Sequence, residues 1–229
     1  MIETIVGPSV VSADTYEDVP DAPLFPEERA AVARAVDKRR LEYTTARVCA
    51  RRALSQLGLP PSPIPSGPRG EPLWPPGVVG SITHCEGYRG AVVGRSAEIA
   101  TLGIDAEPHL PLPDGVLEAI SLPDERTRLR ELTASVPEVA WDRLLFSAKE
   151  SVYKAWFPLA KRWLDFDDAL ITADPGSGTF SARLLVPGPV AQAAGVTGFS
   201  GRWLVRDGLV LTAIVVPADE VCAAPERAA

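Results

Sequence analysis

The sequence is poor in the residues that build disulfide frameworks and histidine-rich metal centres. It has three cysteines and two histidines in 229 residues, and the cysteines are scattered without any C-x-x-C spacing. This pattern argues against disulfides and structural zinc and favours a reducing compartment. No run of 18 apolar residues is present, and the first ten residues lack the basic segment of a secretory signal. We therefore expect a soluble cytoplasmic protein that does not enter a membrane.

Basic residues are fewer than acidic ones, and the net charge is −7. The region from Arg29 to Arg69 differs, because it holds nine basic residues against two acidic ones. A short positive stretch in an acidic protein favours a compact anionic ligand over nucleic acid, which needs a broad basic surface. A solvated helix face would have the same composition, so charge alone leaves both interpretations open.

The N-terminal region has helical signals and is followed by a proline-rich segment. Pro26 and two glutamates suit a helix start, and apolar residues recur up to Gly58, which predicts one or two amphipathic helices over 26–57. Residues 60–77 contain eight prolines and can form neither a helix nor a central strand. Because a free linker rarely carries a residue such as Trp74, we expect an ordered loop that lies across the domain.

Strand and helix patterns alternate in the rest of the chain and predict an α+β class. The expected strands are 78–83, 88–94, 99–106 and 180–186, and the expected helices are 114–120 and 138–156. A loop is expected around 121–123, and Pro158 should stop the second helix. The segment 201–216 predicts a hairpin that turns at Asp207-Gly208. No internal repeat is legible.

Two acids lie at the end of the expected strand 99–106 and just after it. Asp105 and Glu107 in GIDAE are two residues apart, so they point to the same face of the strand. Oxygen donors without cysteine or histidine nearby suit Mg²⁺. Two solvated acids at a strand end would look the same, and the bare D-x-E spacing does not distinguish these interpretations.

A third acid lies on the long helix. Two polar residues, Glu150 and Lys154, lie nearly opposite its expected buried stripe. That stripe consists of Trp141, Leu145, Ala148, Val152 and Ala155. The functional interpretation makes the glutamate a metal ligand or general base and the lysine a phosphate partner. A surface ion pair is the alternative. A capping box is disfavoured, because the apolar period begins before it.

Small polar residues surround one of the two histidines. His84 ends the segment GSITH at an expected strand end, a position that suits hydrogen bonds to phosphate. A metal site is disfavoured, because no second ligand is in sight. Nucleophilic catalysis by Cys85 with His84 as its base is also disfavoured, because adjacent residues of a strand point to opposite faces.

Taken together, these motifs resemble a known family. GVVGSITHC at 77–85, LGIDAEP at 102–108 and LFSAKESVYKAWFPL at 145–159 are similar to the signature segments of the phosphopantetheinyl transferases. The longer, monomeric, surfactin-type class, and its actinomycete members above all, is the best match. The resemblance covers most of the chain, including 67–75, 112–123 and 201–216, and the three motifs stand in the family's order.

The resemblance implies two similar α+β halves related by a pseudo-twofold axis, with coenzyme A in the cleft between them. Residues 1–106 would form the nucleotide side and residues 107–229 the carrier-protein side. The metal ligands would be Asp105, Glu107 and Glu150. The residues in contact with coenzyme A would be Arg39, Arg47, Arg69, Gly70, Thr83, His84, Asp105, Lys149 and Lys154. Of these, Arg47 and then Arg39 would lie near the 3′-phosphate. Many relatives have lysine where this chain has Glu71, and we expect Arg69 to supply that charge.

The implied reaction moves the 4′-phosphopantetheinyl group of coenzyme A to a serine of an apo acyl or peptidyl carrier protein and releases adenosine 3′,5′-bisphosphate. It would activate nonribosomal peptide, polyketide and fatty acid synthases. Asp105 would hold Mg²⁺, Glu150 would take the serine proton, and Lys154 would offset charge on the leaving group. A Mg²⁺-dependent phosphohydrolase and a coenzyme-A-binding protein without activity are the alternatives. An apolar docking surface would argue against the first, and the acid Glu150 beside a diphosphate against the second.

Overall fold

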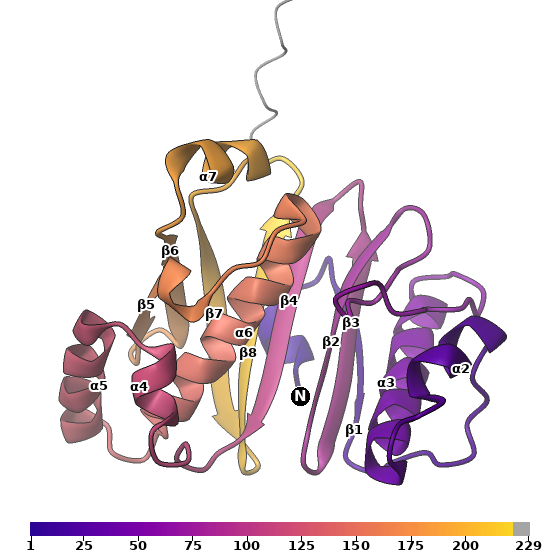
Figure 1. The fold of residues 1–229 in the computed structure, drawn as a ribbon, viewed down its shortest axis with the longest axis horizontal. Coiled ribbons are helices and arrows are strands. Elements are labelled where there is room, and N and C mark those ends of the chain that lie inside the picture. The colour runs from indigo at the N-terminus through magenta and orange to yellow at the C-terminus, as the bar shows by residue number, and fades with distance from the viewer. Residues whose placement is uncertain (222–229) are drawn as a thin grey trace, which may run out of the picture.

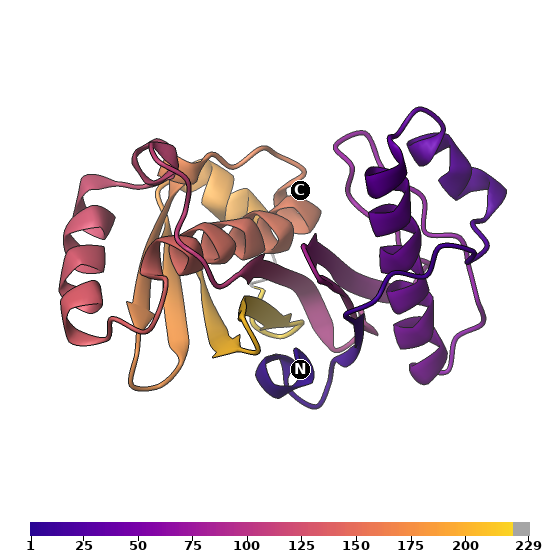
Figure 2. The ribbon, with the colours of Figure 1, turned by 90° about the horizontal axis from the view of Figure 1, so that it is seen from below.

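A computed structural model describes residues 1–221 of the chain. Two antiparallel sheets, each with a long helix packed on it, lie side by side (Figures 1 and 2). This arrangement confirms the expected α+β class. Within the described residues, no helix is both long and apolar enough to cross a membrane. Of the three cysteines, Cys49 and Cys85 are buried and free, and Cys222 lies outside the described residues.

The N-terminal sheet has three strands in the order β1-β3-β2. Its elements are α1 (Glu3–Val6), β1 (Val11–Thr15), α2 (Pro26–Val32), α3 (Asp37–Gln56), β2 (Val78–Cys85) and β3 (Tyr88–Arg95). Helix α3 covers the sheet (Figure 2) with small side chains, since Cys49, Ala50 and Ala53 are fully buried. Small residues at the contact let the helix lie close to the strands. The two helices and the three strands that the sequence predicted between 26 and 106 are confirmed.

The C-terminal sheet has five strands in the order β4-β8-β7-β6-β5. Its elements are β4 (Ile99–Pro108), α4 (Val116–Ile120), α5 (Pro123–Ser135), α6 (Trp141–Ala160), a 3-10 turn (Phe166–Asp168), β5 (Ala169–Asp174), β6 (Thr179–Leu184), α7 (Gly188–Ala194), β7 (Gly198–Arg206) and β8 (Leu209–Pro217). Its core is larger, with Trp141 and Trp156 of α6 almost fully buried. The predicted hairpin is confirmed, because Asp207 and Gly208 turn it with φ of 51° and 75°.

The two sheets meet where β2 runs beside β4 (Figure 1). Two hydroxyl groups of β2 join them. The Ser81 Oγ accepts a hydrogen bond from the backbone N–H of Ile104 at 3.1 Å, and the Thr83 Oγ1 accepts one from Ala106 at 2.9 Å. These side chains replace the backbone acceptors of an ordinary strand pair. The S-x-T spacing of this segment therefore has a structural use at the junction of the halves.

One expectation for the helices is wrong, and a second is correct except for its last residue. Helix α6 continues through Pro158 and ends at Ala160, where Lys161 takes a left-handed conformation and its N–H bonds to the carbonyl of Phe157. A proline removes one helix hydrogen bond, and burial of Trp156 holds the last turn in place despite that loss. The loop expected around 121–123 ends where α5 begins, because Pro123 occupies the first helical position.

The expected division after residue 106 falls inside β4, which pairs with β8 on both sides of that residue. We propose instead that the halves divide in the turn at 96–98, between β3 and β4, so that each half contains one whole sheet. The sequence patterns did not predict five elements of the structure, namely strands β1 and β5 and helices α1, α5 and α7.

Candidate active site

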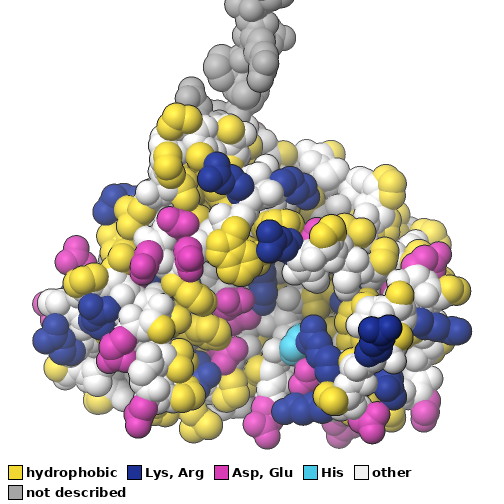
Figure 3. All heavy atoms as spheres, viewed as in Figure 1, with side chains coloured by type: hydrophobic (Ala, Val, Ile, Leu, Met, Phe, Trp, Pro, Cys, Tyr) yellow, Lys and Arg dark blue, Asp and Glu magenta, His cyan; other side chains and the backbone are white. Residues whose placement is uncertain are grey.

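A cavity of about 930 Å³ lies between the two halves. The N-terminal half contributes α3, β2 and the proline-rich loop to its lining, and the C-terminal half contributes the start of β4 and the second part of α6. Figure 3 shows this hollow, with histidine and basic side chains on its N-terminal side. The charged lining residues are Arg39, Arg47, Arg69, Glu71, Glu150, Lys154 and Lys161, and His84 lies among them. The cavity is therefore a mixed but largely basic site for an anionic ligand.

Gly103 brings the acids of β4 close to the helix that carries the third acid. A side chain on Gly103 would place its Cβ 2.0 Å from the backbone oxygen of Ser151 and 2.8 Å from the backbone nitrogen of Ala155. Only glycine allows this approach, because every other residue has a Cβ. The G of GIDAE thus sets the distance between β4 and α6.

Asp105 is the most constrained acid of the site. It is 5% exposed, and its Oδ1 accepts hydrogen bonds from the Lys154 ammonium at 2.7 Å and from the Thr83 hydroxyl at 3.2 Å. The Lys154 ammonium also donates to the carbonyl of Ile104 at 3.1 Å. The other oxygen, Oδ2, is buried and has no hydrogen-bond partner. A buried carboxylate oxygen without a partner is costly, so this atom indicates a place where a ligand or cation binds.

Glu107 and Glu150 are half-buried acids near Asp105. Glu107 forms an ion pair with Arg143 at 2.9 Å, and Glu150 lines the cavity. Burial, and then the negative charge of Asp105, raise the pKa of Glu107 above its ordinary value. Burial also raises the pKa of Glu150. The charge of Lys154 lowers this pKa, and the charge of Asp105 raises it further. The negative charge of Asp105 therefore acts on both glutamates, as it would among carboxylates that share a cation site.

On the N-terminal side, His84 and Arg39 face the cavity together. The Arg39 Nη1 lies 2.7 Å from the His84 Nε2, and Glu42 lies 3.7 Å from the His84 Nδ1. Burial, and then the charge of Arg39, lower the pKa of His84 to about 4. Because a guanidinium can only donate, Nε2 accepts and the neutral imidazole carries its proton on Nδ1, toward Glu42.

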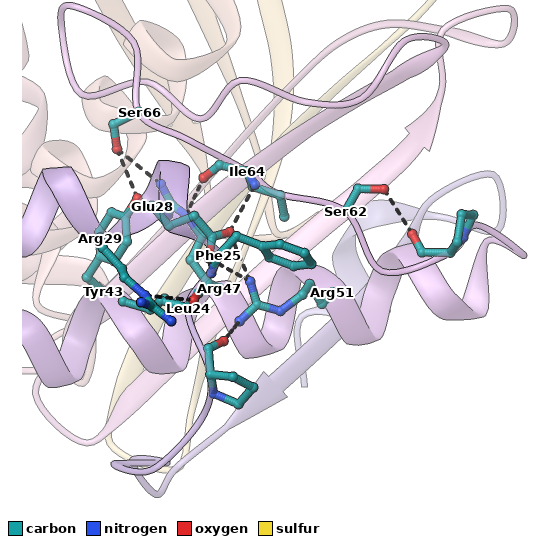
Figure 4. Close-up of polar contacts among 12 residues, drawn as sticks. Leu24, Phe25, Glu28, Arg29, Tyr43, Arg47, Arg51, Ser62, Ile64 and Ser66 are labelled. Atoms are coloured by element: carbon teal, nitrogen blue, oxygen red, sulfur yellow. Dashed lines mark hydrogen bonds and ion pairs between the residues drawn. The ribbon is translucent and has the colours of Figure 1, made fainter.

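Arg47 lines the same side but is 4% exposed. Its Nε donates to the Ile64 carbonyl at 2.8 Å, its Nη2 donates to the Ser66 hydroxyl at 3.2 Å, and its guanidinium lies 4.0 Å from the centre of the Tyr43 ring. Burial lowers the pKa of Arg47 from its very high ordinary value. Arg47 thus holds the proline-rich loop as well as facing the cavity (Figure 4).

Comparison with known proteins agrees with this geometry. The family model of the 4′-phosphopantetheinyl transferase N-terminal domain matches residues 27–94, and that of the 4′-phosphopantetheinyl transferase superfamily matches residues 101–198. The chain is 59% identical to the 4′-phosphopantetheinyl transferase Svp of Streptomyces mobaraensis, across 95% of this chain and 90% of that protein. It is 54% identical to PptT of Mycobacterium tuberculosis, across 89% and 91%, and 49% identical to Npt of Nocardia iowensis, across 93% and 99%.

The chain belongs to the 4′-phosphopantetheinyl transferase superfamily. The resemblance drawn from the three motifs is thereby confirmed, as is its actinomycete character. The transferase uses coenzyme A as its donor and a carrier protein as its acceptor. Enterobactin synthase component D of Salmonella typhi is a further relative, 33% identical across 77% of this chain and 72% of that protein.

The transferase's acids fit a hard cation in their chemistry but do not form a finished cluster. In residues 1–221, no three acidic, histidine or cysteine side chains lie close enough together to hold a metal ion. Asp105 is paired with Lys154 and Glu107 with Arg143. Still, Asp105 offers an unpartnered oxygen, and all three donors are carboxylates, which Mg²⁺ prefers. The donors fit the ion in their chemistry, and two of them also contact a cationic side chain.

Three predicted coenzyme A contacts are not among the cavity-lining residues: Asp105, described above, Lys149 and Thr83. Lys149 is 3% exposed, and its ammonium contacts Glu125 at 2.9 Å and the carbonyls of Phe166 and Ala169. Successive helical residues point about 100° apart, so Lys149 faces the sheet while its neighbour Glu150 faces the cavity. Thr83 is 1% exposed and holds Asp105 and the β4 backbone. In this structure the expected contact with coenzyme A is therefore not available to the side chain of Lys149 or Thr83.

Seven of the predicted site residues line the cavity, and Asp105 and Glu107 are not among the lining residues. Its lining includes Arg39, Arg47, Arg69, Gly70, His84, Glu150 and Lys154. The Glu71 carboxylate accepts the N–H of Arg69 at 2.9 Å and folds back against Gly67, so it serves the loop.

Sequence reasoning missed three residues of this region. Arg143 holds Glu107, Tyr43 supports Arg47, and Tyr153 lines the cavity beside Phe157. Arg143 could have been found, because it lies about two helical turns before Glu150 on the same predicted helix. Nothing in the sequence distinguishes the two tyrosines from ordinary core residues.

Proposed function

We propose that the cavity binds coenzyme A with its nucleotide on the N-terminal half and its diphosphate beside Asp105, Glu150 and Lys154. The observation that carries this proposal is the buried, unpartnered oxygen of Asp105, an acid that pairs with Lys154 in the lining of a basic cavity. A carboxylate alone would repel a diphosphate. A carboxylate that shares a cation and lies next to an ammonium can instead position one.

The N-terminal side supplies groups for the nucleotide phosphates. The Arg39 side chain is 52% exposed and contacts the neutral His84, so both can turn toward a phosphate. Arg69 and Gly70, at the exposed tip of the proline-rich loop, would contact the nucleotide. Arg47 has two nitrogens occupied by the loop, so we assign the 3′-phosphate to Arg39 and loop support to Arg47.

In the reaction, the hydroxyl oxygen of the carrier's serine attacks the phosphorus that bears pantetheine. The bond from that phosphorus to the bridging oxygen breaks, and adenosine 3′,5′-bisphosphate leaves. Glu150 lines the cavity and has a raised pKa, which suits it to accept the serine proton. Lys154 would stay beside the diphosphate and offset the charge that develops on the leaving oxygen.

We propose that Asp105, Glu107 and Glu150 hold Mg²⁺. When bound, the ion would neutralise diphosphate charge and polarise the attacked phosphorus. Thr83 orients Asp105 through the 3.2 Å hydrogen bond, and Arg143 orients Glu107 at 2.9 Å. Such supporting contacts are typical of carboxylates that serve metals.

We also propose a cytoplasmic monomer that modifies carrier proteins of peptide, polyketide and fatty acid synthases and binds neither nucleic acid nor membrane. A single chain supplies both walls of the cavity, which supports the monomer. The free thiols of Cys49 and Cys85 are compatible with a reducing compartment. Of the apolar residues near the carrier side, Ile120 and Phe157 are buried, while Leu110 is 63% exposed and Trp163 is 58% exposed. We infer that the last two offer the acceptor a docking contact.

The test is incubation with coenzyme A, Mg²⁺ and a panel of apo-carrier proteins, followed by intact-mass analysis. One carrier serine should gain one phosphopantetheinyl group, and adenosine 3′,5′-bisphosphate should appear in equal amount. Excess chelator should stop the transfer. Transfer that continues in chelator would exclude the metal, and the absence of transfer to every carrier would exclude the proposed acceptors. Release of the bisphosphate without any carrier would favour the phosphohydrolase.

A further inference from the structure

Two helices, one in each half, begin with the same four-residue pattern. Helix α2 begins at the proline of FPEE, residues 25–28, and α5 begins at the proline of LPDE, residues 122–125. Each has an apolar residue at the N-cap, proline at the first helical position and glutamate at the third. The glutamates, Glu28 and Glu125, are 0% and 2% exposed. A repeat of only four residues, separated by most of a domain, is not legible as a sequence period.

Glu28 connects three segments of the N-terminal half (Figure 4). Its Oε2 accepts the N–H of Phe25 at 3.0 Å, which closes the first turn of α2. Arg51 of α3 donates to both carboxylate oxygens, at 2.9 and 3.0 Å. The Glu28 Oε1 also accepts a hydrogen bond from the backbone N–H of Ile64 at 2.9 Å. The carboxylate therefore fixes α2, α3 and the proline-rich loop to one another.

Glu125 makes the same three kinds of contact in the C-terminal half. Its Oε2 accepts the N–H of Leu122 at 2.8 Å, and Lys149 of α6 lies 2.9 Å from the same atom. Its Oε1 accepts the backbone N–H of Ile171 at 2.7 Å. The N-cap amide, a cation of the long helix and the amide of a distant isoleucine recur in the same arrangement. The pattern marks equivalent positions in the two halves.

The halves differ in what the third contact holds. Ile171 lies in β5, at the edge of the five-stranded sheet and outside the cavity lining. Ile64 lies in the proline-rich loop, which we call the strap, residues 60–77. Its flanking residues, Pro63 and Pro65, have no N–H, so Ile64 carries the one amide donor of that stretch. Glu28 takes this donor, and Arg47 takes the Ile64 carbonyl. Both backbone groups of a fully buried residue are thus held.

The strap continues directly from Ile64 into the cavity wall. Residues 65–73 fold back on themselves, with the N–H of Leu73 bonded to the carbonyl of Pro65 at 2.9 Å. The tip of this turn, with Arg69 and Gly70, lines the cavity. At the far end, the Trp74 indole N–H bonds to the carbonyl of Gly80 at 2.9 Å. Glu28 therefore sets one of the two ends between which the nucleotide-facing turn is suspended.

We propose that Glu28 is a positioning residue for coenzyme A, which acts by fixing the strap through Ile64. Glu125 is its structural counterpart, which stabilises the C-terminal half without shaping the nucleotide site. This inference rests on the proposed placement of the nucleotide against the strap. It makes no use of the acids that carry the transfer, so binding and turnover should separate in its test.

The test compares Glu28→Gln with the matched control Glu125→Gln in the full chain. Each change removes one buried negative charge, keeps the shape of the side chain and lowers the Tm. Glu28→Gln should raise the KM for coenzyme A about tenfold, the effect of weakening one charged hydrogen-bond network, while kcat stays within about twofold. Hydrogen exchange should quicken in peptides that cover 60–77. Glu125→Gln should leave the KM for coenzyme A and the exchange of 60–77 unchanged.

A Glu28→Gln protein that folds and keeps both the wild-type KM and the wild-type exchange of 60–77 would overturn the inference. An equal rise in KM in Glu125→Gln would do the same, because it would mean general loosening. If Glu28→Gln does not fold, Glu28→Asp serves instead. It keeps the charge near Arg51 but is one methylene too short to reach Phe25 and Ile64 together. It should fold and still raise the KM. Failure of the wild type to transfer at all would instead count against the proposed function.

Discussion

The two halves of the molecule share one packing arrangement but present different functional groups to the cavity. In each, a long helix lies on an antiparallel sheet and a short helix begins with proline and a buried glutamate. The N-terminal half has only three strands and a helix contact made of small residues, and it presents arginines and a neutral histidine to the cavity. The C-terminal half has five strands, buried tryptophans and the three acids. The difference suggests that the smaller half binds and the larger half reacts.

This division follows from what each task needs. Binding phosphates requires donors that can adjust, and half-exposed arginines on a loop and a helix can do so. Transfer requires groups held to a fraction of an ångström, which a strand and a helix in backbone contact through Gly103 can provide. The acids are also the more deeply supported set, since Thr83, Lys154 and Arg143 all contact them.

The largest effect should come from Asp105→Asn. The change removes the charge that Lys154 pairs with and weakens the most deeply buried donor of the proposed cation site. We expect kcat/KM to fall about 1,000-fold, as for other losses of a central electrostatic group. Steady-state transfer to a carrier measures it. Asp174→Asn, at an exposed turn, is the control and should match the wild type. Less than a tenfold loss would mean that the larger half does not depend on this acid.

Glu150→Gln should come next. If Glu150 takes the serine proton, kcat should fall at least about 100-fold, while coenzyme A still binds. Calorimetry gives the binding and single-turnover transfer gives the rate. Normal binding together with a normal rate would make Glu150 an ordinary cavity residue, and loss of binding would place it in the nucleotide site.

Much of the reacting half could be predicted from the sequence, and less of the binding half. The acids were found because strands and helices have fixed periods, so Asp105, Glu107 and Glu150 could be assigned to faces. The roles of Lys149 and Thr83 came from the resemblance alone, and the sequence did not show their contacts in the fold. Lys149 faces the sheet, because one residue along a helix turns the side chain by about 100°. Thr83 holds the backbone of β4, and only the pairing of β2 with β4 shows which backbone groups need acceptors.

The strap shows why the fold around the proposed nucleotide site was harder to predict from the sequence. Its prolines exclude regular structure but do not say where the chain goes. Its course is set by contacts with three separate segments: Glu28 of α2, Arg47 of α3 and the carbonyl of Gly80 in β2. Likewise, Pro158 was expected to end α6, but burial of Trp156 outweighs one missing hydrogen bond. Local rules fail here because long-range packing decides.

A smaller effect should separate the two candidate arginines. Arg39→Ala should weaken coenzyme A about tenfold, the low end for a charged hydrogen bond, and weaken dephospho-coenzyme A much less. Arg47→Ala should weaken both ligands equally, because it acts through Ile64 and Ser66 of the strap. Calorimetry with both ligands forms a double-difference cycle. A loss for Arg47→Ala that is confined to coenzyme A would return the 3′-phosphate to Arg47.

The smallest effect concerns His84 and pH. Its pKa is about 4 in the folded protein, below the ordinary value of 6.5. The unfolded chain therefore binds more protons between these values, so stability falls as the pH drops from about 6.5 toward 4. His84→Gln should flatten this part of the curve of unfolding free energy against pH. His109→Gln is the control and should keep it. An NMR titration of His84 near 6.5 would contradict the neutral imidazole.

The division of labour between the halves can be tested with one ligand, adenosine 3′,5′-bisphosphate, which carries the nucleotide and lacks the transferred group. Calorimetric titration into the wild type, Glu150→Gln and Arg39→Ala measures its Kd. If the N-terminal half binds and the C-terminal half reacts, the Kd for Glu150→Gln should equal that of the wild type, and the Kd for Arg39→Ala should rise about tenfold. A Kd that rises in Glu150→Gln and is unchanged in Arg39→Ala would contradict the account.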